Sequence, residues 1–307
     1  MTAASSQKLS KLDDAIHATH LYALRLAALA RESLIAEAEL TPKPGLVDQR
    51  SSGCHQDLSL ELMRTYALAL EPFFYEMAVA STGSEINQEL RETLGDLGRR
   101  AERSMLKATG GHNTHRGAIW TLGLLISAAA LQDSASASAQ ALTATAQKLA
   151  CLPDHTLAAT SHGDIAAARY GITGARGEAR SGFPHILRCG LPTLRAQRNA
   201  GLPETTARLD ALLSIMATLH DTCVLYRGGL TALETLQQHS RAVLIAGGSS
   251  TLEGHAQFLL LDEVTAKLGV SPGGAADLLA GTLLLDAMER DNDHLQPNEA
   301  GGIHGAA

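Results

Sequence analysis

Apolar residues recur at helical spacing along almost the whole chain, and this pattern limits the fold more than any other feature of the sequence. Between Thr205 and Tyr226, for example, leucines and a methionine fall on one face of a helix with 3.6 residues per turn. Aromatic residues make up only 3% of the chain, and stretches with the apolar–polar alternation of strands are missing. The sequence therefore predicts an all-α fold.

The chain is long and apolar enough for one large packed core, with 307 residues of which 45% are hydrophobic. No period of 20–50 residues repeats, which argues against a solenoid. We expect a single compact multi-helix domain over residues 1–290 and a polar, poorly ordered tail over residues 291–307. The predicted helices cover residues 9–39, 57–80, 84–107, 116–131, 138–150, 156–169, 185–197, 205–226, 229–246, 252–268 and 272–290.

Charge and cysteine usage narrow the class of protein. A formal charge of −7 argues against a nucleic-acid binder, which needs a basic surface. The four cysteines are far apart and show no C-x-x-C spacing, which favours a reducing compartment. Neither a signal peptide nor an apolar segment long enough to cross a membrane is visible, so we expect a cytoplasmic protein. The sequence leaves the choice between a monomer and a homodimer open.

The segment 41–57, TPKPGLVDQRSSGCHQD, concentrates charge on a stiff loop. Two prolines forbid a continued helix, and a glycine permits a close turn. Carboxylates beside basic side chains suit a Mg²⁺–polyphosphate, because Mg²⁺ takes one or two carboxylates together with phosphate oxygens. A helix stop with a solvated loop and an N-cap at Asp57 is the simpler alternative. The candidate site residues here are Glu37, Lys43, Asp48, Arg50, His55 and Asp57.

A second loop, TGGHNTHRG at residues 109–117, precedes a predicted helix. Amide groups at a helix start with an arginine in the first turn form an anion site, so Asn113, His115 and Arg116 are candidates. The alternative is a capping loop in which Asn113 or Thr114 caps the helix.

Segment 170–184, YGITGARGEARSGFP, sets Arg176, Glu178 and Arg180 among four glycines. A solvated charge cluster would not need so many glycines, whereas close approach of the backbone to a ligand would. The glycine spacing differs from the dinucleotide-binding fingerprint. We therefore expect a ligand-binding loop here.

Two further segments carry weaker signals. The pair His220-Asp221 at the expected end of a helix, followed by Arg227-Gly228-Gly229, fits either a metal doublet or an ordinary helix-end hydrogen bond. In SPGGAADLL, Ser271 is expected to cap a helix, and two glycines in its first turn are costly unless something comes close. The candidate residues of these segments are Asp221, Arg227, Gly273, Gly274 and Asp277.

Together and in this order, the five segments resemble the triphosphoribosyl-dephospho-CoA synthase family. The matching motifs are T-P-K-P-G-L-V-D, N-T-H-[KR]-G, G-x-R-G-E-A-x-x-G-F-P, an R-G-G after D-T, and S-P-G-G-x-A-D-L-L, and they span most of the chain. The last motif and D-T-C-x-L-x-R-G-G look more like the malonate decarboxylase branch than the citrate lyase branch. Arg116 stands where many relatives have lysine, which keeps the charge.

The resemblance implies a catalytic domain that transfers the triphosphoribosyl group of ATP to the 2′-hydroxyl of 3′-dephospho-CoA and releases adenine. The product would pass to a separate transferase that modifies an acyl carrier protein. Breaking the ribose–adenine bond builds positive charge at C1′, so a carboxylate, a base and a phosphate clamp are needed.

The roles that we assign follow from residue type. Glu178 is expected near C1′, kept ionised by the two neighbouring arginines. His55 or His115 would take the hydroxyl proton or protonate adenine. Lys43, Arg116, Arg176 and Arg180 would hold phosphates. The substrate-binding residues as a whole are Lys43, Arg50, Asn113, Arg116, Arg176, Arg180, Arg227, Gly273 and Gly274, and the candidate Mg²⁺ ligands are Glu37, Asp48, Asp57, Asp221 and Asp277.

Two alternatives come from other classes. A metal-dependent phosphohydrolase would use a His/Asp cluster drawn from His115, His162, His220-Asp221 and Asp262, but it leaves TPKPG and GARGEARSGFP unexplained. A non-catalytic helical partner of a carrier protein would show an exposed apolar groove and bind no nucleotide.

Overall fold

In a computed structural model, the protein folds into one body of packed helices, and no strand occurs in the part of the chain that the structure describes: residues 3–108, 116–132, 137–156 and 161–295. Its helices are α1 (Ala3–Glu39), α2 (Leu60–Ser81), α3 (Gln88–Ala108), α4 (Arg116–Gln132), α5 (Ala139–Cys151), α6 (His162–Tyr170), α7 (Gly174–Arg180), the short π-helix η1 (Ile186–Gly190), α8 (Leu191–Asn199), α9 (Glu204–Met216), α10 (Thr222–Ile245), α11 (Leu252–Leu268) and α12 (Gly273–Leu295). The predicted fold class is confirmed.

Two central helices form the axis of the core. After Arg116, α4 carries no charged residue and is buried from Ala118 to Ala130 except at Trp120, as expected of a helix that is apolar on every side. α12 packs against α1, α4, α9 and η1. Both begin at glycine-rich segments that the sequence marked as functional, so any site at their N-termini is fixed to the core.

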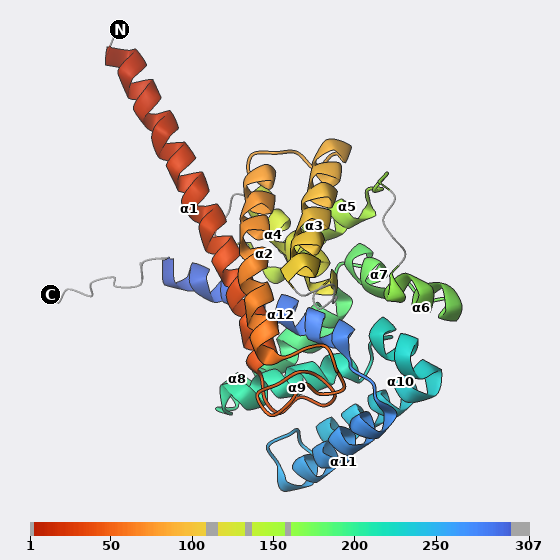
Figure 1. Ribbon diagram of the computed structural model, residues 1–307. Coiled ribbons are helices and arrows are strands. Elements are labelled where there is room, and N and C mark those ends of the chain that lie inside the picture. Colours follow the sequence, from red (N-terminus) through yellow and green to blue (C-terminus); the bar gives the residue numbers. More distant parts are fainter. Residues whose placement is uncertain (1–2, 109–115, 133–136, 157–160, 296–307) are drawn as a thin grey trace, which may run out of the picture.

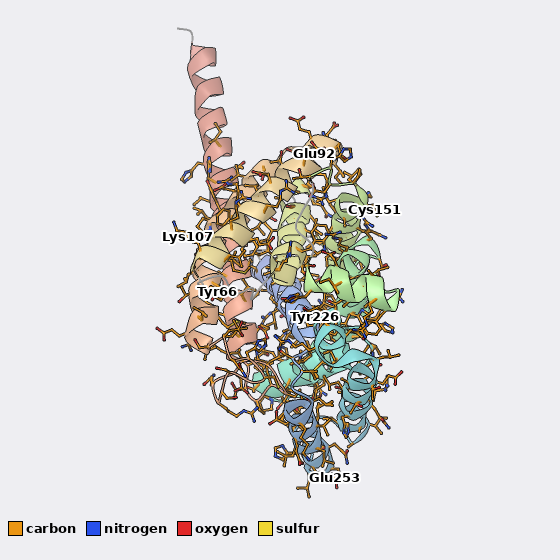
Figure 2. The ribbon with its side chains drawn as sticks, turned by 45° about the vertical axis from the view of Figure 1, so that its right-hand side comes forward. Tyr66, Glu92, Lys107, Cys151, Tyr226 and Glu253 are labelled. Carbon is orange, nitrogen blue, oxygen red and sulfur yellow. The ribbon has the colours of Figure 1, made fainter. Side chains whose placement is uncertain are left out.

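The remaining helices enclose this axis. α1 and α2 lie side by side along one flank, and the first turns of α1 project away from the body, while α10 and α11 form its opposite end (Figure 1). Glu92 and Glu253 mark the two ends, with Tyr226 between them (Figure 2). No helix in the described ranges has the length and apolar character needed to cross a bilayer.

Three of the differences between the predicted and the observed helix boundaries bear on the site and the domain end. The predicted helix 205–226 is two helices, because the Asp221 carboxylate accepts hydrogen bonds from the amides of Cys223 and Val224 and starts α10. The expected break at Gly229 is a kink within α10, where φ is 73°. α12 runs to Leu295, five residues beyond the predicted domain end, and residues 296–307 lie outside the described part.

Candidate active site

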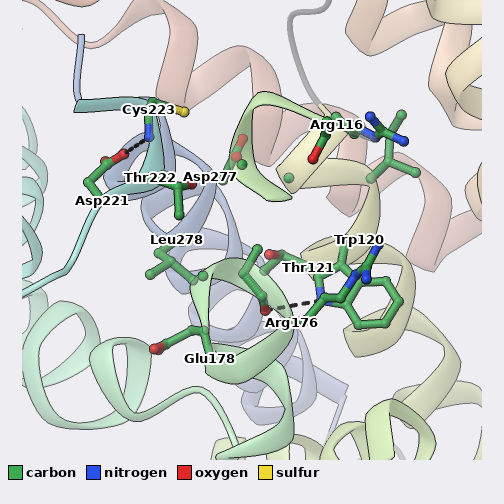
Figure 3. Close-up of a pocket in the computed structure, with 18 of the residues that line it drawn as sticks. Arg116, Trp120, Thr121, Arg176, Glu178, Asp221, Thr222, Cys223, Asp277 and Leu278 are labelled. Atoms are coloured by element: carbon green, nitrogen blue, oxygen red, sulfur yellow. Dashed lines mark hydrogen bonds between the residues drawn. The ribbon is translucent and has the colours of Figure 1, made fainter. Parts of the chain in front are cut away.

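One large cavity of about 1350 Å³ lies between the loop 40–59, α3, α4, α6, α7, α10 and α12. Cavities that hold one drug-sized ligand measure roughly 300–1,000 Å³. The cavity is therefore large enough for two substrates. Arg116 and Trp120 of α4, Asp221 at the start of α10 and Asp277 of α12 reach it (Figure 3).

Helix N-termini make up much of the cavity wall. We call the first residues of α4, α6, α10 and α12 the helix-start wall; its members in the lining are Arg116, Gly117, His162, Gly163, Thr222, Cys223, Gly273 and Gly274. Each helix N-terminus carries a partial positive charge of about half an elementary charge and points amide donors outward. Four of them around one space favour a polyanionic ligand.

Asp221 connects two of these helix starts. Its side chain is buried and accepts a hydrogen bond from the Cys223 amide (Figure 3) and another from the Ala275 amide of α12, the latter at 2.9 Å. Burial raises the pKa of the Asp221 carboxyl, and the amides of Ala275 and Cys223 oppose that rise. The doublet with His220 thus lies at the start of a helix instead of the expected end, and its carboxylate already serves as a cap.

Ser271 does not fill the capping role that the sequence suggested. Its hydroxyl lies 2.8 Å from His55 Nε2, while Asp221 takes the Ala275 amide. Gly273 and Gly274 are explained by close packing of α12 on α10, because an added Cβ would lie 3.1 Å from Cys223 Sγ or from the Asp221 carboxylate.

Asp277, one turn into α12, lies in an acidic environment. Burial raises the pKa of the Asp277 carboxyl well above its usual value, and the negative charges of Glu37 and Asp221 raise it further. Gly117 of α4 leaves the room for this side chain, since a Cβ at Gly117 would lie 1.9 Å from Asp277 Oδ2. The grouping would accept a cation readily.

The carboxylates do not form a complete metal cage. Among the described residues, no three His, Cys, Asp or Glu side chains converge well enough to hold a metal ion by themselves. Glu37, Asp57, Asp221 and Asp277 all line the cavity. They fit a Mg²⁺ that arrives with phosphate oxygens, since protein-bound Mg²⁺ needs only one or two carboxylates.

The TPKPG loop contributes a buried ion pair. Lys43 Nζ donates to both the carbonyl and the carboxylate of Glu37, each at 2.6 Å, and both side chains are almost fully buried. Two of the three ammonium protons are thus engaged. Lys43 lines the cavity mainly as the partner of Glu37.

Two predicted site residues do not line the cavity. Asp48 is buried and accepts hydrogen bonds from the amides of Lys43, Arg50 and Ser51, so it holds the loop together. Arg50 pairs with Asp48 and Asp262. Neither residue is in the lining of the cavity, so the Mg²⁺ role of Asp48 and the substrate-binding role of Arg50 stay predictions that this placement does not support. The helix that follows is capped by Ser59, not by Asp57.

His55 lies in the cavity with its ring nearly buried. Nε2 contacts Ser271, and Nδ1 lies 3.4 Å from Arg227 Nη2 and 3.9 Å from Asp57 Oδ1. Burial and the Arg227 charge lower the pKa of His55 to about 4. The ring is therefore neutral at pH 7, and because a guanidinium only donates, the closer neighbour favours an unprotonated Nδ1.

Segment 170–184 is not the open loop that the glycines suggested. Residues 174–180 form helix α7, in which Glu178 lies on the side opposite Arg176 and Arg180, because positions two apart lie about 200° apart on a helix and positions four apart share a side. Arg176 lies 3.5 Å from Asp164, and Arg180 donates to the Ala150 carbonyl. The expected flanking of Glu178 by two arginines is therefore wrong.

Glu178 is paired with a histidine that the sequence analysis missed. The amide and Nδ1 of His185 both lie 2.8 Å from the Glu178 carboxylate, which is buried and lines the cavity. Phe183 makes this turn possible by adopting a positive φ of 56°, a strained backbone that its complete burial holds in place. A histidine directly after G-F-P was the available signal.

The second cavity wall consists of side chains from the middle of α3. We call Arg91, Gly95, Gly98, Arg99 and Glu102 the α3 wall; all five lie in the cavity lining. Glu102 pairs with Arg116 of α4 at 2.9 Å. The sequence analysis named none of the five. Two glycines inside a charged helix were the only hint. Asn113 and His115 lie outside the described residues.

Residues 23–295 match the CitG family, ATP:dephospho-CoA triphosphoribosyl transferase. A relative from Azotobacter vinelandii is 54% identical over 86% of the chain and 91% of its own length, and one from Pseudomonas fluorescens Pf0-1 is 55% identical over 87% and 92%. Both carry the name probable 2-(5″-triphosphoribosyl)-3′-dephosphocoenzyme-A synthase. No solved structure matches the chain.

Proposed function

The chain belongs to the ATP:dephospho-CoA triphosphoribosyl transferase family, and on that premise we propose that it transfers the triphosphoribosyl group of ATP to 3′-dephospho-CoA with release of adenine. The observation that carries the proposal is the cavity, which has room for two substrates and a wall of helix N-termini suited to a triphosphate.

In this reaction the 2′-hydroxyl oxygen of dephospho-CoA bonds to C1′ of the ATP ribose while the C1′–N9 bond breaks. The hydroxyl proton is lost and adenine leaves protonated, so the reaction balances without another reactant. The transition state resembles an oxocarbenium ion, which a buried carboxylate stabilises. We assign this role to Glu178, which His185 holds in place from two donors.

The remaining roles follow from the lining. Arg116, Arg176 and Arg227 would contact the triphosphate together with the helix-start wall. His55 is better suited to accept a proton than to donate one, because a ring whose pKa is about 4 carries no extra proton at pH 7. Mg²⁺ bound to the triphosphate would neutralise part of its charge, and Glu37, Asp57, Asp221 and Asp277 are the carboxylates that would hold it.

The His/Asp phosphohydrolase alternative gains no support from the described residues. His162 stacks on Tyr226 with ring centroids 4.1 Å apart, and Asp262 pairs with Arg50 outside the cavity. Two of the proposed metal ligands are therefore engaged in other contacts, in different places.

A second and more specific proposal concerns the carrier protein that receives the product. We infer that the product serves the malonate decarboxylase carrier protein, which rests on the D-T-C-x-L-x-R-G-G and S-P-G-G-A-A-D-L-L motifs. The test offers the product to the purified carrier proteins of malonate decarboxylase and citrate lyase, each with its own transferase, and measures which one is modified. Modification of the citrate lyase protein alone would contradict the assignment.

The decisive experiment incubates the purified protein with ATP, Mg²⁺ and dephospho-CoA and follows adenine by chromatography and the coenzyme product by mass spectrometry. We expect adenine only when dephospho-CoA is present, with one triphosphoribosyl group added to it. Release of ADP or inorganic phosphate in place of adenine would overturn the proposal.

A further inference from the structure

Two arginines of the cavity share one carboxylate, and a third arginine lies near them. Arg99 Nη1 lies 2.9 Å and Arg91 Nη2 3.4 Å from the same oxygen, Asp154 Oδ2. Arg180, fixed through its Nε to the Ala150 carbonyl, lies close enough for its charge to lower the pKa of Arg91, as do burial and Arg99. Three cations and one anion leave an excess of two positive charges at this place.

Arg91 is the most confined of the three. Its side chain is only 7% exposed, its guanidinium lies 5.3 Å from the ring centre of Trp120, and its buried Nε has no hydrogen-bond partner among the described residues. A buried donor without a partner costs roughly 1–3 kcal/mol, more when the group is charged. An anion that accepted this hydrogen bond would remove the cost.

The cluster is closely packed. Gly95 lies beneath it, and an added Cβ there would lie 2.6 Å from Asp154 Oδ2 and about as close to both guanidinium groups, at 3.0 Å from Arg91 and 3.1 Å from Arg99. The arginines are thus held on the α3 wall before a ligand arrives, and planar guanidinium groups bind phosphate oxygens in pairs.

We propose that Arg91, Arg99 and Arg180 form a diphosphate subsite that holds the diphosphate bridge of dephospho-CoA. The inference rests on the proposed function for the identity of the ligand. A diphosphate diester carries two negative charges, which equals the excess of the cluster. The more highly charged triphosphate of ATP matches the helix-start wall, where the helix N-termini and the candidate Mg²⁺ carboxylates lie.

The test is calorimetric titration of dephospho-CoA into the full-length wild type, Arg99→Gln and Arg100→Gln. Arg100 is the matched control: it lies on the same helix but pairs with Glu76 and does not line the cavity. We expect Arg99→Gln to weaken dephospho-CoA binding by at least about tenfold, the loss of one charge-assisted contact. Arg100→Gln should bind within twofold of wild type, and ATP affinity should change by less than threefold in both.

If Arg99→Gln does not fold, Arg180→Gln replaces it in the test, because Arg180 is exposed and its substitution should not disturb the core. We expect the same weakening of dephospho-CoA binding. Unchanged dephospho-CoA binding in the folded variant overturns the subsite, and so does a loss of ATP binding alone or a wild type that does not bind dephospho-CoA. Adenine release by the same wild-type preparation is scored separately, so failure of the proposed reaction is distinguished from failure of the subsite.

Discussion

The two walls of the cavity are built in opposite ways. The helix-start wall consists of the first residues of four helices, with glycines where backbones meet and one carboxylate, Asp221, that caps two helices. The α3 wall consists of long side chains from the middle of one helix, held by ion pairs to Asp154 and Arg116. The first wall is fixed by backbone geometry and the second by side-chain charge.

We expect the two walls to have different tasks: the first positions the groups that react, and the second binds substrate. Backbone packing fixes positions tightly, which the reacting groups need. Asp277 lies one turn into α12, His55 contacts Ser271 just before that helix, and Glu178 is held by the backbone amide of His185. Arginine side chains on a preformed helix can adapt to a flexible diphosphate. Changes in the first wall should therefore lower kcat or destabilise the fold, and changes in the second should weaken substrate binding.

The largest effect is expected at Glu178. Glu178→Gln keeps the shape but removes the charge that would stabilise C1′, so kcat should fall roughly 10²–10⁴-fold while ATP affinity stays within about twofold. Adenine release and calorimetry measure the two quantities, and Glu263→Gln on exposed α11 is the control. Turnover near the wild-type value would remove Glu178 from the mechanism.

His55 should make stability depend on pH. Its folded pKa of about 4 lies below the unfolded value of about 6.5, so the unfolded chain binds the proton first as the pH falls. The contribution of His55 to the free energy of unfolding, up to roughly 3 kcal/mol, is therefore fully present above pH 6.5 and is lost as the pH falls to 4. Urea unfolding of His55→Gln should show a flatter profile over this window, whereas His255→Gln on the surface should follow the wild type.

Gly117 tests the packing of the helix-start wall. Gly117→Ala places a methyl group against Asp277 Oδ2, so either the buried Asp277 side chain or the two helices must shift. We expect the free energy of unfolding to fall by about 1–3 kcal/mol and the rate of adenine release to fall clearly. Thermal unfolding and the adenine assay measure the two quantities. An alanine variant with wild-type stability and rate would show that α4 and α12 are not fixed by this contact.

Gly98 is the counterpart on the α3 wall, with the smallest expected effect. An added Cβ meets only Met77 Cε, at 4.0 Å. Gly98→Ala should stabilise the protein by up to about 1 kcal/mol, because alanine favours the helix, and leave kcat unchanged. A destabilised Gly98→Ala variant would contradict the contrast between the two walls.

The sequence predicted the helix-start wall better than the α3 wall, for a physical reason. Helix starts need prolines, glycines and capping residues in fixed order, so Gly117, Pro272 and Gly273 leave a readable pattern. Ordinary arginines in mid-helix, such as Arg91 and Arg99, look like a solvated face until the fold brings Asp154 beside them. The fold class was predictable because helical periodicity survives in almost every segment.

The differences between the predicted and the observed contacts share one cause. Asp48, Arg50 and the arginines around Glu178 were assigned from nearness in sequence, whereas their partners depend on which way each side chain points. Asp48 turns back to the amides of its own loop, and Glu178 finds His185 seven residues on, across the strained turn at Phe183. Spacing along the chain shows such directions only within regular helices.

The glycine packing of the helix-start wall also decides how this cavity can change through mutation. At Gly117, Gly273 and Gly274 the first carbon of any side chain already meets a neighbour, whereas Gly98 faces open space. Evolution or design of a new acceptor specificity should therefore proceed through α3, one side chain at a time. A change in the helix-start wall needs substitutions on two helices at the same time. Selection that proceeds one substitution at a time seldom finds such pairs.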